Sequence, residues 1–247
     1  MIPLRDNVPR TRPPLVTWTL IGLCTLVFLY EQLLPDRILF EFLHIYGVVP
    51  ARFTNASYAA VVGYPEDGYA SFVTYMFLHG GWLHYLLNMW VLWIFADNVE
   101  EALGSLRFLL YYLACGLAAA GAHVLFNWNA TMPVIGASGA IAGVMGGYFR
   151  LFPKARVVTL IPIIIIPWIV ELPAVVFLGI WFLVQLFSGL AGAVGPGEAQ
   201  PVAFWAHVGG FAAGLALVRV FLPPGCQFCF DPAARRYDRE GSDSYKG

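Results

Sequence analysis

The sequence predicts an all-α polytopic membrane protein, a bundle of six transmembrane helices. Hydrophobic residues make up 59% of its 247 residues and charged residues only 12%, whereas about 25% of the residues in an ordinary soluble domain are charged. The apolar residues also gather in several blocks of about 20 residues, the length that spans a bilayer core. The net charge of −1 gives no reason to expect a nucleic-acid partner. The lipid bilayer is therefore the expected surrounding.

Six apolar blocks are the predicted spanning helices. They cover residues 15–34, 82–99, 106–126, 138–152, 172–190 and 203–222. The first block is longer than the apolar part of a signal peptide, and no small-x-small cleavage site follows it. We therefore predict three parts of the chain: an N-terminal segment 1–14, a membrane domain 15–222 and a flexible polar tail 223–247.

Three connecting segments are not expected to span. Residues 35–70 are too polar. Residues 157–170 are apolar, but Pro162 and Pro167 interrupt them, so we expect a re-entrant or interfacial stretch. The loop 192–201 is rich in Gly and Pro, a composition suited to a movable cap over a site.

Basic residues predict the orientation, because cytoplasmic loops are enriched in Lys and Arg. With six spans, the two termini and the second and fourth loops share one side. That side holds Arg5, Arg10, Arg12, Arg107, Arg150, Lys154, Arg156, Arg235, Arg236, Arg239 and Lys246, and the other side only Arg37 and Arg52. Both termini are therefore expected in the cytoplasm, with the chain in the cell (inner) membrane.

The four cysteines do not predict a metal centre. Cys24 and Cys115 lie in apolar blocks and are expected to be packing residues. Cys226 and Cys229 form a lone CxxC, which is at most half of a zinc site, and neither a second pair nor a histidine lies near them in the sequence. We expect no metal and no cofactor.

Polar side chains at bilayer depth are costly, so each one needs a reason. His84 and Asn88 are four residues apart and share one face of the second predicted helix. Ser138 starts the fourth helix, on which Gly139, Gly143 and Gly146 follow. His207 lies near the start of the sixth helix and precedes Gly210 and Gly214 by about one and two turns.

The two glycine series predict that the fourth and sixth helices pack closely, because small residues at this spacing let membrane helices approach. Such packing would bring Ser138 to His207. A serine hydroxyl becomes a nucleophile when a base takes its proton, and His207 is the candidate base. His84 and Asn88 are then candidate donors to the oxyanion. Alternatively, Ser138 is a packing residue, since neither a membrane serine nor a GxxxG pair is specific alone.

At these motifs the sequence resembles bacterial members of the rhomboid family of intramembrane serine proteases. The resemblance covers about residues 72–217 and rests on His79-Gly-Gly-Trp-Leu-His84-Tyr-Leu-Leu-Asn88, Asn98-Val-Glu100-Glu-Ala-Leu-Gly104, Gly136-Ala-Ser138-Gly139 and Ala206-His207-Val-Gly-Gly210. It implies a six-helix rhomboid-like bundle that cuts transmembrane protein substrates. It further implies Ser138 as nucleophile, His207 as base without an acidic third member, and His84, Asn88 and the Ser138 backbone N–H as oxyanion donors. Glu100 would be a structural carboxylate.

Two positions depart from that pattern. Some family members carry a Trp-Arg pair in the first long loop, whereas here Arg52 has no adjacent Trp. Some carry a Tyr one turn after the serine, stacked on the base histidine; here that position is Ala142, so another feature must orient His207.

Other interpretations remain open. An inactive rhomboid relative would bind membrane clients without cutting them, but such relatives usually lose the serine or the histidine. A small transporter would place Asp or Glu in mid-helix, whereas here the acidic residues fall near helix ends. Trp181 and Phe182 on the fifth helix either form part of a lateral substrate gate or face lipid. The sequence predicts neither the substrate nor the oligomeric state.

Overall fold

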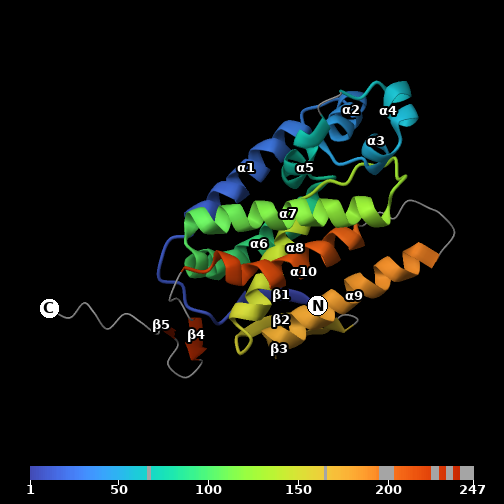
Figure 1. The fold of residues 1–247 in the computed structure, drawn as a ribbon. Coiled ribbons are helices and arrows are strands. Elements are labelled where there is room, and N and C mark those ends of the chain that lie inside the picture. The colour runs from blue at the N-terminus through green and yellow to red at the C-terminus, as the bar shows by residue number, and fades with distance from the viewer. Residues whose placement is uncertain (66–67, 164–165, 195–202, 224–227, 232–235, 240–247) are drawn as a thin grey trace.

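The computed structural model describes residues 1–247 except 66–67, 164–165, 195–202, 224–227, 232–235 and 240–247. Each predicted apolar block forms one long helix (Figure 1). These helices are α1 (Leu15–Glu31), α6 (Trp82–Leu103), α7 (Ser105–Phe126), α8 (Ser138–Leu151), α9 (Ala174–Val194) and α10 (Phe204–Phe221). The helical membrane fold is confirmed.

Three of these helices, α7, α9 and α10, are long and apolar enough to cross a membrane by length and hydropathy alone. The other three do not meet that criterion. α1 is apolar but has 17 residues, α6 has 22 residues but no sufficiently apolar stretch of the required length, and α8 has only 14 residues. The count of six spans therefore stays a prediction.

Helix α8 lies at the centre of the bundle, in contact with α6, α7, α9 and α10. Most of its residues are buried, and Figure 1 shows it running between α7 and α9. Its most extensive packing is against α10, which also packs along α7. The predicted approach of the fourth and sixth apolar blocks is therefore correct.

Glycines on both helices make this approach possible. A Cβ atom on Gly210 would lie 2.0 Å from the carbonyl oxygen of Gly139, and one on Gly214 would lie 1.9 Å from that of Gly143. Side chains larger than hydrogen would force the backbones apart. A Cβ atom on Gly139 or Gly143 would meet α7, 2.7 Å from Ala119 Cβ and 2.3 Å from Cys115 Cβ respectively, whereas a Cβ atom on Gly146 would meet α10, 2.2 Å from the carbonyl oxygen of Phe211. The glycines of α8 thus serve two neighbouring helices.

The long segment after α1 forms a compact group of short helices. These are α2 (Asp36–Tyr46), α3 (Pro50–Thr54), α4 (Ala56–Val62), η1 (Gly68–Ala70), α5 (Ser71–Thr74) and η2 (Tyr75–Phe77), gathered at the far end of α1 (Figure 1). Arg52 holds the group together by donating to the carbonyl oxygens of Ile45 and Pro65 and by packing against the rings of Phe53 and Tyr64. The Trp-Arg contact of some relatives is therefore replaced by other partners of the arginine.

The described part of the apolar stretch 157–170 is extended and not helical, and its expected interfacial or re-entrant position stays a prediction. The stretch lies in an antiparallel hairpin of β2 (Arg156–Ile163) and β3 (Ile166–Pro173), in which Pro162 faces Pro167. A third strand, β1 (Ile2–Asp6), pairs with β2 and completes the order β1-β2-β3. The sequence interpretation missed this sheet, because its N-terminal strand and its hairpin are about 150 residues apart.

The N-terminal segment is bound along α6. Arg10 lies 3.8 Å from Asp97, and the Trp90 indole donates to the carbonyl oxygen of Pro3 at 2.6 Å. At the start of α1, the Glu100 carboxylate accepts hydrogen bonds from the backbone of Val16 and from the backbone and side chain of Thr17, at 2.8–2.9 Å. Glu100 is 2% exposed and thus joins α6 to α1, in agreement with the structural role that the resemblance implies.

The C-terminal tail contains one described hairpin, β4 (Phe228–Asp231) paired with β5 (Arg236–Arg239). Cys226 and most of the predicted cap 192–201 lie outside the described residues. The flexibility of the tail and the movement of the cap remain predictions.

Candidate active site

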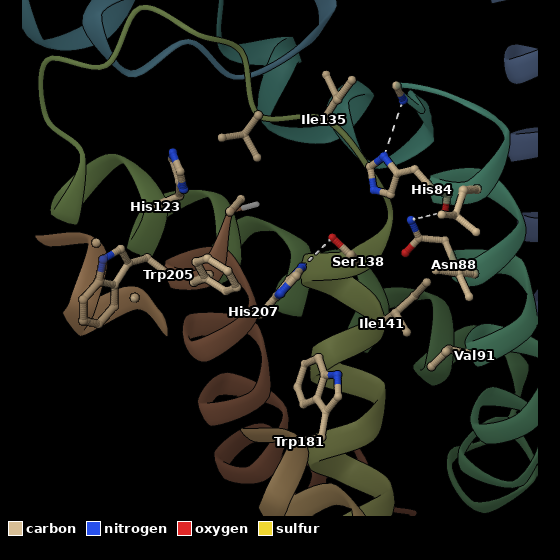
Figure 2. Close-up of a pocket in the computed structure, with 18 of the residues that line it drawn as sticks. His84, Asn88, Val91, His123, Ile135, Ser138, Ile141, Trp181, Trp205 and His207 are labelled. Carbon is tan, nitrogen blue, oxygen red and sulfur yellow. Dashed lines mark hydrogen bonds between the residues drawn. The ribbon is translucent and has the colours of Figure 1, made fainter. Parts of the chain in front are cut away.

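The four predicted site residues lie together at one end of the bundle (Figure 2). Ser138 is the first residue of α8 and His207 lies in the first turn of α10. His84 and Asn88 lie in the first two turns of α6. Because these three helices begin at the same end of the bundle, their first turns converge on one site.

Ser138 and His207 are hydrogen bonded to each other. The distance from Ser138 Oγ to His207 Nε2 is 2.8 Å. This contact follows from the packing of α8 on α10. Gly210, about one turn after His207, lies directly against the carbonyl oxygen of Gly139, the residue after Ser138. The pairing that the glycine series predicted is present, and its geometry is that of a serine activated by a base.

The turn before Ser138 brings the serine toward α6. Gly136 has φ +119°, a conformation that L side chains rarely adopt, and its N–H donates to the Tyr75 carbonyl oxygen at 2.8 Å. A Cβ atom on Gly136 would also lie 2.8 Å from Nε2 of His84. Glycine here therefore permits both the backbone turn and the close approach of the His84 imidazole to the segment before Ser138.

Three donors surround the space beside the serine. His84 Nδ1 accepts from the Gly80 N–H at 3.4 Å, which leaves the proton of the neutral ring on Nε2. Asn88 Nδ2 donates one N–H to the His84 carbonyl oxygen at 3.0 Å and has a second N–H to offer. The Ser138 N–H lies in the first turn of α8, where backbone donors have no partner within the helix.

The ring of His84 is supported from behind. His79 packs edge-on against it with ring centroids 5.4 Å apart. The backbone N–H of His79 is in turn held by both carboxylate oxygens of Glu31 at 3.2 Å. Glu31 is 1% exposed, so this buried carboxylate ties the end of α1 to the loop that carries His79.

A cavity of about 1540 Å³ opens over these residues; its lining includes His84, Asn88, His123, Ser138, Trp181 and His207. Helix α8 has 14 residues and is therefore about 21 Å long, shorter than the bilayer core of about 30 Å. The cavity gives Ser138 access from the end of the bundle at which α6, α8 and α10 begin.

Two residues at the site were missed by the sequence analysis. Gln185 of α9 has its Oε1 atom 2.8 Å from Nδ1 of His207, and His123 lies near the end of α7. Gln185 is an uncharged amide inside an apolar helix, and the rule that a polar group at bilayer depth needs a reason would have found it. Trp181 and Phe182 pack on Phe211 of α10, with ring centroids 6.2 and 4.8 Å away, and their part in a lateral gate stays a prediction.

Comparison with known proteins agrees with this arrangement. A model of the rhomboid domain family matches residues 66–224, more than half of the chain, and includes all four site residues. The chain belongs to the rhomboid family. It is accordingly a multi-pass membrane protein with a helical fold.

Several curated rhomboid proteins are similar to parts of it. RHOMBOID-like protein 4 of Arabidopsis thaliana is 32% identical over 145 residues, which cover 59% of this chain and 32% of the relative. From Bacillus subtilis, the putative rhomboid protease YdcA is 35% identical over 44% of this chain and 54% of its own length, and the rhomboid protease GluP is 42% identical over 30% and 14%. The chain thus spans about half or less of the length of these relatives.

Proposed function

We propose that this rhomboid protein is an intramembrane serine endopeptidase that hydrolyses peptide bonds in or near transmembrane helices of membrane protein substrates. The observation that carries the proposal is the 2.8 Å contact between Ser138 Oγ and His207 Nε2 inside a cavity that also holds His84 and Asn88. Two of the similar bacterial proteins are named as proteases. An inactive client-binding relative would have no need of the intact pair.

The mechanism follows from the geometry. Ser138 Oγ attacks the carbonyl carbon of the scissile bond while His207 Nε2 takes the hydroxyl proton. The oxyanion receives hydrogen bonds from Asn88, His84 and the Ser138 N–H, which are in place before the reaction begins. His207 then gives the proton to the leaving amine, and an acyl-enzyme remains on Ser138. Water attacks that ester with His207 again as base, which releases the second product and restores the serine.

Access of water and substrate fits the cavity at the site. We place the open end of the cavity on the outer side of the cell membrane and both termini in the cytoplasm, in accord with the distribution of Lys and Arg. Water reaches Ser138 through the cavity, and a substrate helix enters sideways between α6 and α9. Helices must unwind for cleavage, so Gly or Pro near the scissile bond should ease it.

The test uses the purified protein in lipid with a fluorophosphonate probe and a transmembrane substrate. We expect the probe to label Ser138 and the substrate to be cut. Ser138→Ala and His207→Ala should each abolish cleavage, and the double variant should be no worse than either one because the two residues act as a unit. Substantial turnover by folded Ser138→Ala protein would refute the proposal, whereas a transporter would leave the probe unreacted.

A further inference from the structure

The imidazole of His207 is held from α9 as well as from Ser138. Its Nδ1 atom lies 2.8 Å from Oε1 of Gln185, while its Nε2 atom lies 2.8 Å from Ser138 Oγ. We infer that Gln185 is a positioning residue that sets the tautomer and the orientation of His207, an inference that rests on the proposed proteolytic function. Ser138, His207 and Gln185 thus form a hydrogen-bonded series of three side chains whose third member is a neutral amide.

The tautomer decides whether His207 can act as a base. A neutral imidazole carries one proton, and the nitrogen that holds it is set by the hydrogen bond at that nitrogen. The amide oxygen of Gln185 only accepts, so it keeps the proton on Nδ1. Nε2 then has a free lone pair directed at the hydroxyl of Ser138. In the opposite tautomer Nε2 would carry the proton and could not take another.

The surroundings of Gln185 hold its amide in place. Gln185 is 9% exposed and lies in the middle of α9, an apolar helix of 21 residues. Trp181, one turn earlier on the same face, has its ring centroid 5.8 Å from that of His207. One face of α9 therefore contacts both the ring and the Nδ1 atom of the base.

This arrangement accounts for the small residue at position 142. Some relatives place a tyrosine ring one turn after the serine, whereas Ala142 of this chain is fully buried and too small to reach the imidazole. A residue of α9, Gln185, thus orients the imidazole of His207 in place of a residue of α8. A neutral amide also avoids placing a carboxylate among apolar side chains, where an ion is costly to bury.

The experiment compares three variants of the purified protein in lipid. Gln185→Met removes the acceptor but keeps the length of the side chain, and Gln185→Glu keeps an acceptor that cannot donate when ionised. Phe187→Leu is the control, because Phe187 is on the same helix and 64% exposed. The kcat and KM for a transmembrane substrate, the rate of fluorophosphonate labelling and the pH profile are measured for each.

Gln185→Met should lower kcat and the labelling rate by about 10- to 100-fold, the size expected for a lost buried hydrogen bond of about 1–3 kcal/mol, while KM stays within about twofold. Gln185→Glu should keep most of the turnover. It should also move the acid limb of the pH profile to higher pH, because a carboxylate favours the protonated imidazole. Phe187→Leu should match the wild type.

The outcomes separate this inference from the proposed function. Wild-type kinetics in Gln185→Met, or a Glu variant with an unmoved pH profile, would overturn the positioning role and leave the Ser138–His207 pair intact. A wild-type protein that neither cleaves nor reacts with the probe would overturn both. A measurement on the wild type is independent of variant folding: the ¹⁵N signals of His207, assigned with His207→Ala, should show the proton on Nδ1. A proton on Nε2 contradicts the inference.

Discussion

Substitution of Gly214 by alanine should separate α8 and α10, which carry the proposed catalytic residues Ser138 and His207. The new Cβ atom would lie 1.9 Å from the Gly143 carbonyl oxygen and 2.6 Å from its carbon. Both are backbone atoms, so no side-chain rotation relieves the clash. An ordinary van der Waals contact begins at about 3.4 Å, so α8 and α10 must move apart by about 1.5 Å.

A shift of that size would break the hydrogen bond between Ser138 and His207. The 2.8 Å separation of Ser138 Oγ and His207 Nε2 would grow to about 4 Å, beyond hydrogen-bond range. A misplacement of about 1 Å can lower a rate about 100-fold. Overpacking of this kind typically costs about 1–3 kcal/mol of folding free energy, so the variant should be both less stable and nearly inactive.

The assay measures the fluorophosphonate labelling rate and the thermal unfolding of Gly214→Ala in lipid. Gly121→Ala is the matched control, because Gly121 lies on α7 and a Cβ atom there would meet no neighbouring atom within 4 Å, and alanine favours a helix over glycine by about 1 kcal/mol. The control should be as active as the wild type and at least as stable. If Gly214→Ala labels and unfolds like the wild type, the close approach of α8 and α10 does not set the site.

Three further predictions test other parts of the molecule. Asn88→Ala and His84→Ala should each lower kcat more than they change KM, with about 2.7–4 kcal/mol of transition-state stabilisation lost; steady-state kinetics would contradict the oxyanion role if both kept full turnover. Trp181→Ala should change cleavage of a transmembrane substrate more than that of a short soluble peptide, and equal effects on both would argue against lateral entry beside α9. Burial raises the pKa of Asp6 from 3.8 to about 7, so the folded protein holds a proton that the unfolded chain releases over that interval. Its stabilising effect is full below pH 3.8 and is lost as the pH rises through 7. Wild-type protein should therefore lose more thermal stability than Asp6→Asn between about pH 5 and pH 8, and parallel losses would refute this assignment.

The helices and the contact between Ser138 and His207 could be predicted because their signals are local. Apolar blocks report helices directly, and the spacing of Gly210 and Gly214 after His207 indicates which face of the last helix approaches its neighbour. The start of α8 at Ser138 then requires the serine and the histidine to meet. The shared helix face of His84 and Asn88 made them candidate oxyanion donors, and the resemblance implied the same roles.

The features that were missed depend on distant parts of the chain. Strand β1 pairs with β2 across about 150 residues, and the prolines of the hairpin made 157–170 resemble an interrupted membrane segment. To predict the partner of His207 Nδ1, one must also know how α9 is rotated about its own axis. An apolar helix with few polar residues does not reveal that rotation. Gln185 could be suspected as a polar residue in such a helix, but its target could not.

Helix α9 contributes two side chains whose proposed roles oppose each other. Its Trp181 forms part of the cavity wall, and its Gln185 contacts His207, the proposed base. If a substrate helix enters between α6 and α9, the outward movement of α9 withdraws Gln185 from His207 during that step. Substrate entry and the reaction are then coupled. Ser138 is poorly activated while α9 is displaced outward, and His207 becomes an effective base again when α9 returns. Labelling of Ser138 should accordingly slow as spin-label distances between α6 and α9 increase, and labelling that ignores those distances would refute the coupling. Membrane proteins that contact the opening without binding in the cavity would then not be cleaved.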